Sequence, residues 1–394
     1  MLHGAGRAYW TVLVVRVVSD LEFDPLELTL LGTALELSIL VAEVPTGVVA
    51  DLVSRRLSVI VSFLVMGPAI VAAGLVDGFW AMAATQVVWG IGYTFQSGAD
   101  VAWVTDELGD EGGVDRLLLR RATVQMGAMV VGVIAAAVLA ATVSRSGAIV
   151  AIGAVVTVWG VVLALVMPER RFTPHPGAGL ADFTRVLRVG GNLTRRTPVL
   201  RRLVVGVLLA AVAAEAIDRL EYARLTEVGL PERVDEVSLV AGLMISASLI
   251  GIFLVRGIER FVDRRNGSRA APGVLGGLFV VTAAMVALVA GAGVFGVVAV
   301  AIVAKEAALL GTEPLMAMIA NDHDESSARA TVLSFVGQAT AAGEIIGGVA
   351  LGALARSAGL SSALIVAAGL FAVAGIVVAR PSRPVGSPRW TSAP

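Results

Sequence analysis

Residues 43–59, EVPTGVVADLVSRRLSV, place a glutamate, a Pro-x-Gly break, an aspartate and paired arginines between two apolar runs. Of the 394 residues in the chain, 57% are hydrophobic and 15% are charged, whereas soluble domains carry about 25% charged residues. The mean hydropathy is +0.86. We therefore expect the polar stretch to be a short loop between two membrane-spanning helices.

Several functional classes are disfavoured by composition and motifs. The net charge of −1 argues against a nucleic-acid partner, because phosphate binding needs a basic surface. The chain has no cysteine, which excludes disulfides and thiolate metal sites. The G-x-G-x-x-G match at Gly291–Gly296 joins two apolar runs rather than a strand and a helix, so it does not indicate a dinucleotide site. We expect no enzyme activity, no cofactor and no metal.

The apolar runs predict the number of membrane crossings. A spanning helix needs about 20 mostly apolar residues. Eleven runs have this length, and residues 7–23 form a shorter first span. The eleven lie near 26–50, 57–77, 79–103, 119–142, 146–167, 200–224, 236–256, 272–291, 294–319, 328–354 and 358–379. We expect an all-α membrane protein with twelve transmembrane helices.

A polar stretch divides these helices into two groups of six. The expected organisation is a first bundle at 1–167, a central loop with an amphipathic segment at 168–199, a second bundle at 200–380 and a tail at 381–394. Basic residues gather in the loops on one side, whereas the opposite loops hold Glu22, Asp24, Glu232, Asp235 and Glu236. By the positive-inside rule, both termini are expected in the cytoplasm of a bacterium, with the chain in the plasma (inner) membrane.

The first loop carries a family signature. Residues 47–56, with Gly47, Asp51, Arg55 and Arg56, resemble the G-x-L-A-D-R-x-G-R-R/K loop of the major facilitator superfamily. The preceding Glu-Val-Pro-Thr-Gly resembles the E-x-P-T-G variant of its drug:proton antiporters, which are similar to tetracycline and macrolide exporters. The resemblance implies two six-helix bundles and a conformational latch, to which Asp106 is the expected third partner. Leu52 and Ser54 depart from the pattern, so proton antiport is implied by the branch alone.

Ionisable groups within the expected spans are candidates for proton coupling, because charge in the bilayer is costly. With 1.5 Å rise per residue, Glu43 lies about 12 Å above Asp51 and Arg16 about 13 Å above Arg7. This equal depth predicts an Arg16–Glu43 ion pair. Glu36 lies seven residues from Glu43 and so shares its helical face.

The second half holds a further set of charges. Glu215 and Arg219 are spaced i, i+4 and can pair, which leaves Asp218 as a spare carboxylate. Lys305 and Glu306 are adjacent and point about 100° apart, so we expect them not to pair with each other. Including Glu344, the coupling candidates of this half are Glu215, Asp218, Lys305, Glu306 and Glu344.

Neutral polar and aromatic side chains supply candidates for a substrate cavity. They could contact an apolar molecule, although helix packing also accounts for them. The candidates are Gln86, Trp89, Tyr93, Gln125, Phe335 and Gln338.

The first span is unusually short. Its uncharged part, residues 8–15, extends only about 12 Å. Relatives have a longer outer half here, so residues 18–25 are where helix is expected to be missing. Either the bilayer thins around a stretched helix, or the chain is truncated and impaired.

Taken together, these features predict proton-coupled efflux of a small hydrophobic or cationic drug-like molecule by alternating access, carried out by a monomer. The alternatives are an uptake facilitator for a small nutrient and a non-transporting membrane sensor or scaffold.

Overall fold

The protein was analysed as a computed structural model that describes residues 2–109, 114–174, 180–264, 270–321 and 326–380. These residues form helices and no strand. The helices are α1 (Leu2–Val15), the π-helical turn η1 (Arg16–Asp20), α2 (Pro25–Leu52), α3 (Arg55–Leu75), α4 (Phe79–Gln96), α5 (Ala99–Leu108), α6 (Val114–Thr142), α7 (Arg145–Val166), α8 (Leu180–Arg196), α9 (Pro198–Val228), α10 (Glu236–Arg264), α11 (Ala271–Gly291), α12 (Phe295–Leu309), α13 (Thr312–Asn321), α14 (Ser326–Ala358) and α15 (Leu360–Ala379).

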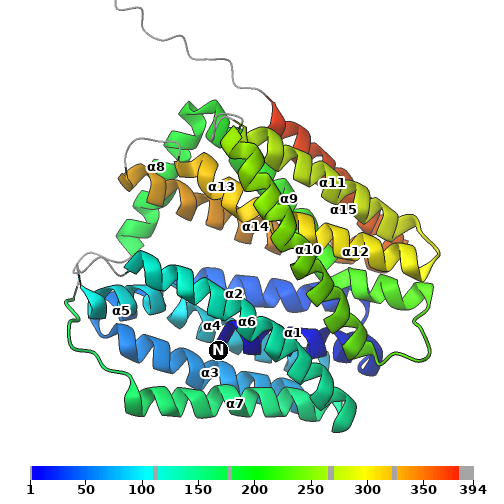
Figure 1. Ribbon diagram of the computed structural model, residues 1–394, viewed down its shortest axis with the longest axis horizontal. Helices are drawn as coiled ribbons and strands as arrows, with labels where there is room; N and C mark the ends of the chain where they lie inside the picture. The colour runs from blue at the N-terminus through cyan, green and yellow to red at the C-terminus, as the bar shows by residue number, and fades with distance from the viewer. Residues whose placement is uncertain (1, 110–113, 175–179, 265–269, 322–325, 381–394) are drawn as a thin grey trace, which may run out of the picture.

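The helices form two bundles that lie one above the other in Figure 1, with α1–α7 in the lower bundle and α9–α15 in the upper. Nine helices of the described residues are long and apolar enough to cross a membrane. The first span, α4 with α5, and the charged α9 complete the predicted twelve crossings. The all-α fold of two membrane bundles is therefore confirmed.

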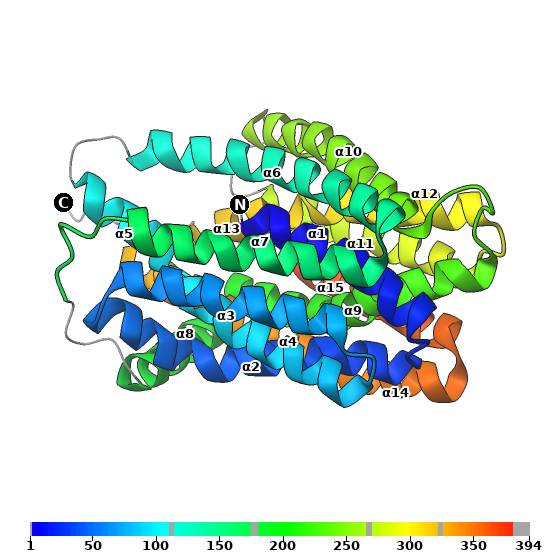
Figure 2. The ribbon, with the colours of Figure 1, turned by 90° about the horizontal axis from the view of Figure 1, so that it is seen from below.

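Small residues bring helices together within each bundle, as is typical where membrane helices cross. A Cβ on Gly153 in α7 would lie 2.7 Å from the carbonyl oxygen of Gly67 in α3. In the second bundle, a Cβ on Gly276 in α11 would lie 2.6 Å from the carbonyl oxygen of Gly375 in α15. The views in Figures 1 and 2 agree that α3 runs beside α7 and α11 beside α15, at the periphery of each bundle.

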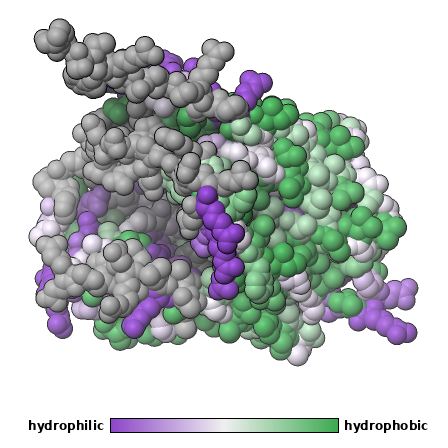
Figure 3. All heavy atoms as spheres, turned by 45° about the horizontal axis from the view of Figure 1, so that its top comes forward, coloured by the Kyte–Doolittle hydropathy of each residue, from purple (hydrophilic) through white to green (hydrophobic). Residues whose placement is uncertain are grey.

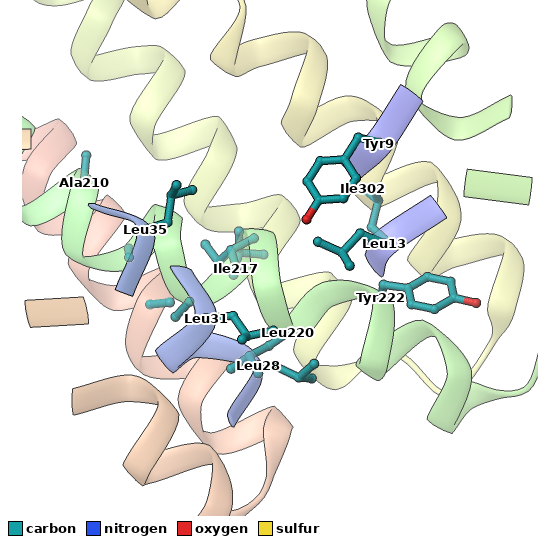
Figure 4. Packing of buried hydrophobic residues seen from close by; sticks show 14 of the residues in the cluster. Tyr9, Leu13, Leu28, Leu31, Leu35, Ala210, Ile217, Leu220, Tyr222 and Ile302 are labelled. Atoms are coloured by element: carbon teal, nitrogen blue, oxygen red, sulfur yellow. The ribbon is translucent and has the colours of Figure 1, made fainter. Parts of the chain in front are cut away.

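The two bundles share one apolar core where α2 meets α9. Leu28 and Leu31 of α2 lie close to Ile217 and Leu220 of α9 in Figure 4, and all four side chains are buried. Because this packing joins the bundles through close-fitting side chains, it fixes the position of the polar groups on α9 relative to α2.

The molecule has two polar ends. We call the end that holds α5, α8 and residues 54–56 the central-loop end, and the end that holds Asp20, Glu22, Asp24 and Glu236 the acidic end. They lie to the left and right of Figure 1. Between them the surface is largely apolar in Figure 3, and Val131 within α6 and Phe253 within α10 expose 67% and 71% of their surface. Such a belt is what lipid requires of a spanning protein.

The first helix corrects one expectation. The backbone of Gly4 in α1 packs against Ala128 and Gly132 of α6, more than a dozen residues beyond the α6 start at Val114. At its other end, α1 continues through η1 to Asp20 at the acidic end. The first span therefore falls short at its N-terminal end, on the side of the central-loop end. The prediction that helix is missing from its outer half, at residues 18–25, was wrong. Assigning Arg7 to the membrane surface caused the error.

The central segment contains α8, which packs against α14: a Cβ on Gly190 would lie 2.8 Å from the Cβ of Phe335. A helix thus lies in the central segment, where the sequence predicts an amphipathic piece. The predicted tail, 381–394, lies outside the described residues.

Candidate functional site

The predicted latch residues form a network at the central-loop end. Arg55, at the start of α3, contacts the carboxylate of Asp106 in α5 and donates to the carbonyl oxygen of Ala102 at 3.2 Å. Its distance to Asp51 is 3.7 Å. The Arg55 side chain is 11% exposed, whereas that of Asp51 is 38% exposed. Because exposed ion pairs contribute little, Asp106 is the stronger partner.

Arg56 ties α3 to the end of α7. Its Nε donates to the carbonyl oxygen of Met167 at 2.6 Å, and its Nη2 donates to that of Ala164 at 2.5 Å. The Arg56 backbone N–H donates to Glu169 at 2.9 Å, and the hydroxyl of Ser54 donates to the same carboxylate at 2.6 Å. Arg56 thus satisfies the free carbonyls that end a helix, rather than reaching out to lipid headgroups.

Two further details describe the latch in this conformation. A Cβ on Gly47 would meet nothing within 4 Å, so this glycine is not needed for a close helix approach here. Within the described residues, the hydrogen bonds and ion pairs of Arg55 and Arg56 all lie in the first bundle. In this conformation the network stiffens one bundle, and it does not join the two.

Arg16 is not the partner of Glu43, and this prediction was wrong. Arg16 Nη2 lies 2.8 Å from Asp77 and 3.1 Å from the carbonyl oxygen of Val76, and its Nη1 contacts the hydroxyl of Ser146. These partners lie at the α3–α4 and α7 termini near the acidic end. Arg16 is close to the acidic end because α1 reaches it.

Glu236, the first residue of α10, joins the two bundles at the acidic end. Its carboxylate accepts from the hydroxyl of Ser19 at 2.6 Å and from that of Tyr222 at 2.7 Å. The Arg145 guanidinium lies 3.4 Å from Glu236 and 2.5 Å from Asp20. Ser19 and Arg145 belong to the first bundle, so these contacts close the acidic end.

A cavity of about 480 Å³ lies between the bundles, within the size range of small-molecule sites. Its walls come from α1, α2, α9, α10, α12 and α13, and it runs from Val17 and Tyr222 near the acidic end to Arg7 and Glu313. Arg7, the reference residue for the predicted depth of Arg16, is exposed into this cavity.

Lys305 of α12 is fully buried beside the cavity, and three carboxylates surround its ammonium. The Nζ atom lies 2.5 Å from Glu306, 2.8 Å from Glu221 and 3.5 Å from Asp218. The expectation that Lys305 and Glu306 do not pair was wrong, because two long side chains can converge although their Cβ atoms diverge. Asp218 is likewise paired rather than spare, although 57% of its side chain is exposed.

The predicted Glu215–Arg219 pair is present on α9, with Nε 2.9 Å from Oε1. The Arg219 guanidinium also lies 4.8 Å from the ring centre of Trp10, a cation–π arrangement. This pair is pressed against Gly32 of α2, where a Cβ would overlap the Glu215 carboxylate. Arg219 is therefore held by groups of both bundles.

Glu36 of α2 and Glu344 of α14 lie near each other at the bundle interface, where these two helices pack together. Glu215, Asp218 and Arg219 on α9 are charged groups close to this pair, and Tyr93 on α4 lies near Glu36. Glu43 lies about two turns beyond Glu36 on α2. Its carboxylate accepts a hydrogen bond from the side-chain amide of Gln338 in α14 at 3.3 Å.

None of the six residues predicted to line a cavity is among those that line this one. Gln86 is fully buried and donates to the Tyr9 hydroxyl at 2.9 Å. Trp89 stacks on Tyr93 with ring centres 5.6 Å apart, and Phe335 packs on α8. Gln125 on α6 and Gln338 on α14 are half-buried, and neither is among the cavity residues. The packing interpretation was the better one for this set.

The cavity instead uses residues that the sequence reasoning did not select. Trp10, Glu221, Tyr222, Glu313 and Arg7 line it. The sequence did contain a signal for Glu221. It follows Asp218 at i, i+3 and therefore lies on the same face of the helix. Arg7 and Trp10 could not be placed while the first span was set at the wrong depth.

Comparison with known proteins identifies similar chains. The family model described as Major Facilitator Superfamily matches residues 1–323. A solved structure of a nucleoside transporter, a NupG point variant, is 14% identical, with a TM-score of 0.78 and 96% of each chain covered. A POT family transporter in complex with a thioalcohol-conjugated peptide is 12% identical, with a TM-score of 0.73 and coverage of 95% of this chain and 92% of that chain.

A bacterial homologue of the human lysosomal transporter Spinster, in an inward-facing and unoccupied conformation, is 15% identical, with a TM-score of 0.68 and coverage of 96% and 93%. At these identities the similarity concerns the fold. No curated protein matches the sequence.

Proposed function

Because the chain belongs to the major facilitator superfamily, we propose that it is a secondary transporter that exports a small hydrophobic cation in exchange for protons. The observation that carries this proposal is the cavity between the bundles, which combines apolar and aromatic walls with an excess of carboxylates. Alternating access to such a site is how the two-bundle architecture moves a solute.

The charges of the cavity favour a cation. Five carboxylates line it, on Glu215, Asp218, Glu221, Glu306 and Glu313. Three cations, Arg7, Arg219 and the adjoining Lys305, offset them only in part. Two negative charges remain if every group is ionised, and a low-dielectric wall strengthens their attraction for a cation. Trp10 and Tyr222 add aromatic surface, which suits an apolar cation.

The orientation follows from the distribution of basic residues. We place the central-loop end in the cytoplasm of a bacterium and the protein in the plasma membrane. The contacts of Glu236 then close the outer side, so the conformation is inward-facing and the chain functions as a monomer of two bundles, 1–167 and 200–380. The Arg55–Asp106 network keeps the first bundle rigid as it rocks.

Glu36 and Glu344 are the proposed proton site. Two carboxyl groups that lie close together repel each other when both are ionised, so this pair is suited to hold one proton. The neighbouring cation, Arg219, is already paired with Glu215, and it cannot neutralise both. Because the two carboxyls belong to different bundles, movement of one bundle alters their contact.

Ethidium, a hydrophobic aromatic cation, is the test probe. In liposomes that contain the purified chain, an acidic lumen is expected to drive ethidium accumulation, and a protonophore is expected to abolish it. Glu36→Gln and Glu344→Gln should remove the dependence on the pH gradient, whereas Asp218→Asn should weaken ethidium binding. Glu232→Gln, in an exposed loop, is the matched control.

Two results would reject the proposal: ethidium flux that persists after the gradient is collapsed, or no flux of cations under any gradient. The second result would favour a non-transporting sensor or scaffold.

A nutrient carrier is the second candidate. The exposed Arg7 and the acidic residues face the same cavity, and a zwitterionic nutrient could contact both. Uptake of an amino acid or dipeptide, with ethidium inactive, would support this candidate.

A further inference from the structure

The ammonium of Lys305 occupies the centre of a carboxylate site whose spacing suits a metal ion. The carboxylate oxygens of Asp218, Glu221 and Glu306 lie within 4.8 Å of one another. Oxygen ligands in such a group are those that Ca²⁺, Mg²⁺ and Mn²⁺ prefer. Lys305 is fully buried, and its Nζ lies 2.5–3.5 Å from all three carboxylates. A tethered monovalent cation thus stands where a divalent ion would bind.

The three carboxylates come from two helices that are held in place. Asp218 and Glu221 lie one turn apart on α9, and Glu306 follows Lys305 on α12. Ile302, one turn before Glu306, is part of the buried core. The site is therefore built on rigid elements, and its geometry does not depend on the lysine alone.

We propose that Lys305 is a specificity-determining residue that excludes divalent metal ions from the Asp218–Glu221–Glu306 site and reserves the cavity for monovalent organic cations. The ammonium acts in two ways. It fills the space between the carboxylates, and its charge repels a second cation. The site keeps net negative charge, chiefly at the exposed Asp218, and this charge attracts a monovalent cation from the cavity.

The selectivity follows from space and from the ligands that stay free. Both the repulsion by Lys305 and the attraction to the carboxylates are twice as large for a divalent ion as for a monovalent ion at the same distance, so charge alone does not discriminate. A monovalent organic cation can also remain near Asp218 and Trp10 without entering the space between the carboxylates. A small metal ion needs several oxygen ligands at once, and the ammonium takes those ligands first.

The test measures binding of Mn²⁺ by its electron paramagnetic resonance signal, using the purified full-length chain in detergent. Lys305→Ala should bind Mn²⁺ at least about a hundredfold more tightly than the parent chain, since the repelling charge and the filling atoms are both removed. Mn²⁺ should also raise the Tm of Lys305→Ala and leave that of the parent unchanged. The double variant Lys305→Ala with Asp218→Asn should lose the gain.

A variant that lacks Lys305 leaves three carboxylates without their cation and can fail to fold. Lys305→Gln is the second variant, because its amide can donate to one carboxylate and its oxygen can bind the metal. It should also bind Mn²⁺ more tightly than the parent. Equal Mn²⁺ affinity in the parent and the folded variants, or a gain that survives Asp218→Asn, would overturn the inference.

The inference rests on the proposed cation site, and the two can fail separately. Mn²⁺ binding in detergent requires no transport, so it can be measured even if ethidium does not move. If ethidium is transported, Mn²⁺ should inhibit its flux in Lys305→Gln liposomes and leave that of the parent unaffected.

Discussion

The closed acidic end makes a quantitative prediction for Glu236→Gln. The carboxylate accepts from Ser19 at 2.6 Å and from Tyr222 at 2.7 Å, and it lies 3.4 Å from Arg145. The substitution keeps the shape. The hydrogen bond from Ser19 crosses between the bundles and becomes a neutral one, at a cost of about 1 kcal/mol, whereas the hydrogen bond from Tyr222 lies within the second bundle and is the same in the closed and open states. Adding a small term for the partly exposed Arg145 ion pair, we expect the closed state to lose about 1.5 kcal/mol, or about tenfold in its population ratio.

Cysteine labelling can measure this shift, because the chain has no native cysteine. Val17→Cys places a thiol in the cavity wall near the closed end. A membrane-impermeant maleimide applied from the acidic side should label it about tenfold faster when Glu236→Gln is added. Val234→Cys, in an exposed position of the acidic-end loop, shows which vesicles present that side.

Glu232→Gln removes a neighbouring exposed carboxylate and should leave the labelling rate unchanged. The reasoning would be refuted if Glu236→Gln labelled at the parent rate while Val234→Cys reacted fully. That result would mean that apolar packing, rather than the Glu236 contacts, keeps the end closed.

Three further predictions concern packing, pH and the latch. Gly276→Val should lower the Tm and destabilise the protein by about 1–3 kcal/mol through overpacking. Gly277→Val is the control and should leave the Tm unchanged, because a Cβ at Gly277 meets nothing within 4 Å. Equal Tm values for the two variants would contradict the contact between α11 and α15. The backbone N–H groups of Arg170 and Arg171 lower the pKa of Glu107. The ionised carboxylate therefore stabilises the fold fully above the ordinary glutamate pKa of 4.5, and this stabilisation is lost as the pH falls through the lowered pKa. Trp103 fluorescence should report this low-pH change, and Glu107→Gln should show it already at neutral pH; unchanged titrations would contradict it. Asp106→Asn should lower the Tm by removing the charged partner of a largely buried guanidinium, and a Tm equal to the parent's would show that the ion pair is not stabilising.

Local patterns were the part of the site that the sequence could predict. The Glu215–Arg219 pair follows from i, i+4 spacing and is present. The Arg55–Asp106 contact follows from a loop motif and is also present. Both inferences required only short-range geometry or a family pattern, and neither depended on the relative depth of two distant helices.

The failed predictions share a different cause. The Arg16–Glu43 pair assumed that Arg7 marked the membrane surface, but Arg7 lies in the cavity and Arg16 binds Asp77. Depth along a helix cannot be counted until one residue is correctly anchored. For Lys305 and Glu306, the direction of Cβ was a poor guide, because side chains with several rotatable bonds can reach a common point. Cavity residues failed similarly, since rotation about each helix axis is set by packing that only the assembled bundles define.

The arrangement of charge along α9 explains why substrate and proton could influence each other. Glu215 and Arg219 press against Gly32 of α2, whereas Asp218, on the same helix, lies 3.5 Å from Lys305 of α12. Only about 4.5 Å of helical rise separates Glu215 from Asp218, so a cation near Asp218 changes the potential at both Glu215 and Glu344. Positive charges on substrate and proton then disfavour one another, since like charges in a low-dielectric interior repel strongly. Exchange, rather than joint transport, is therefore the coupling that we propose.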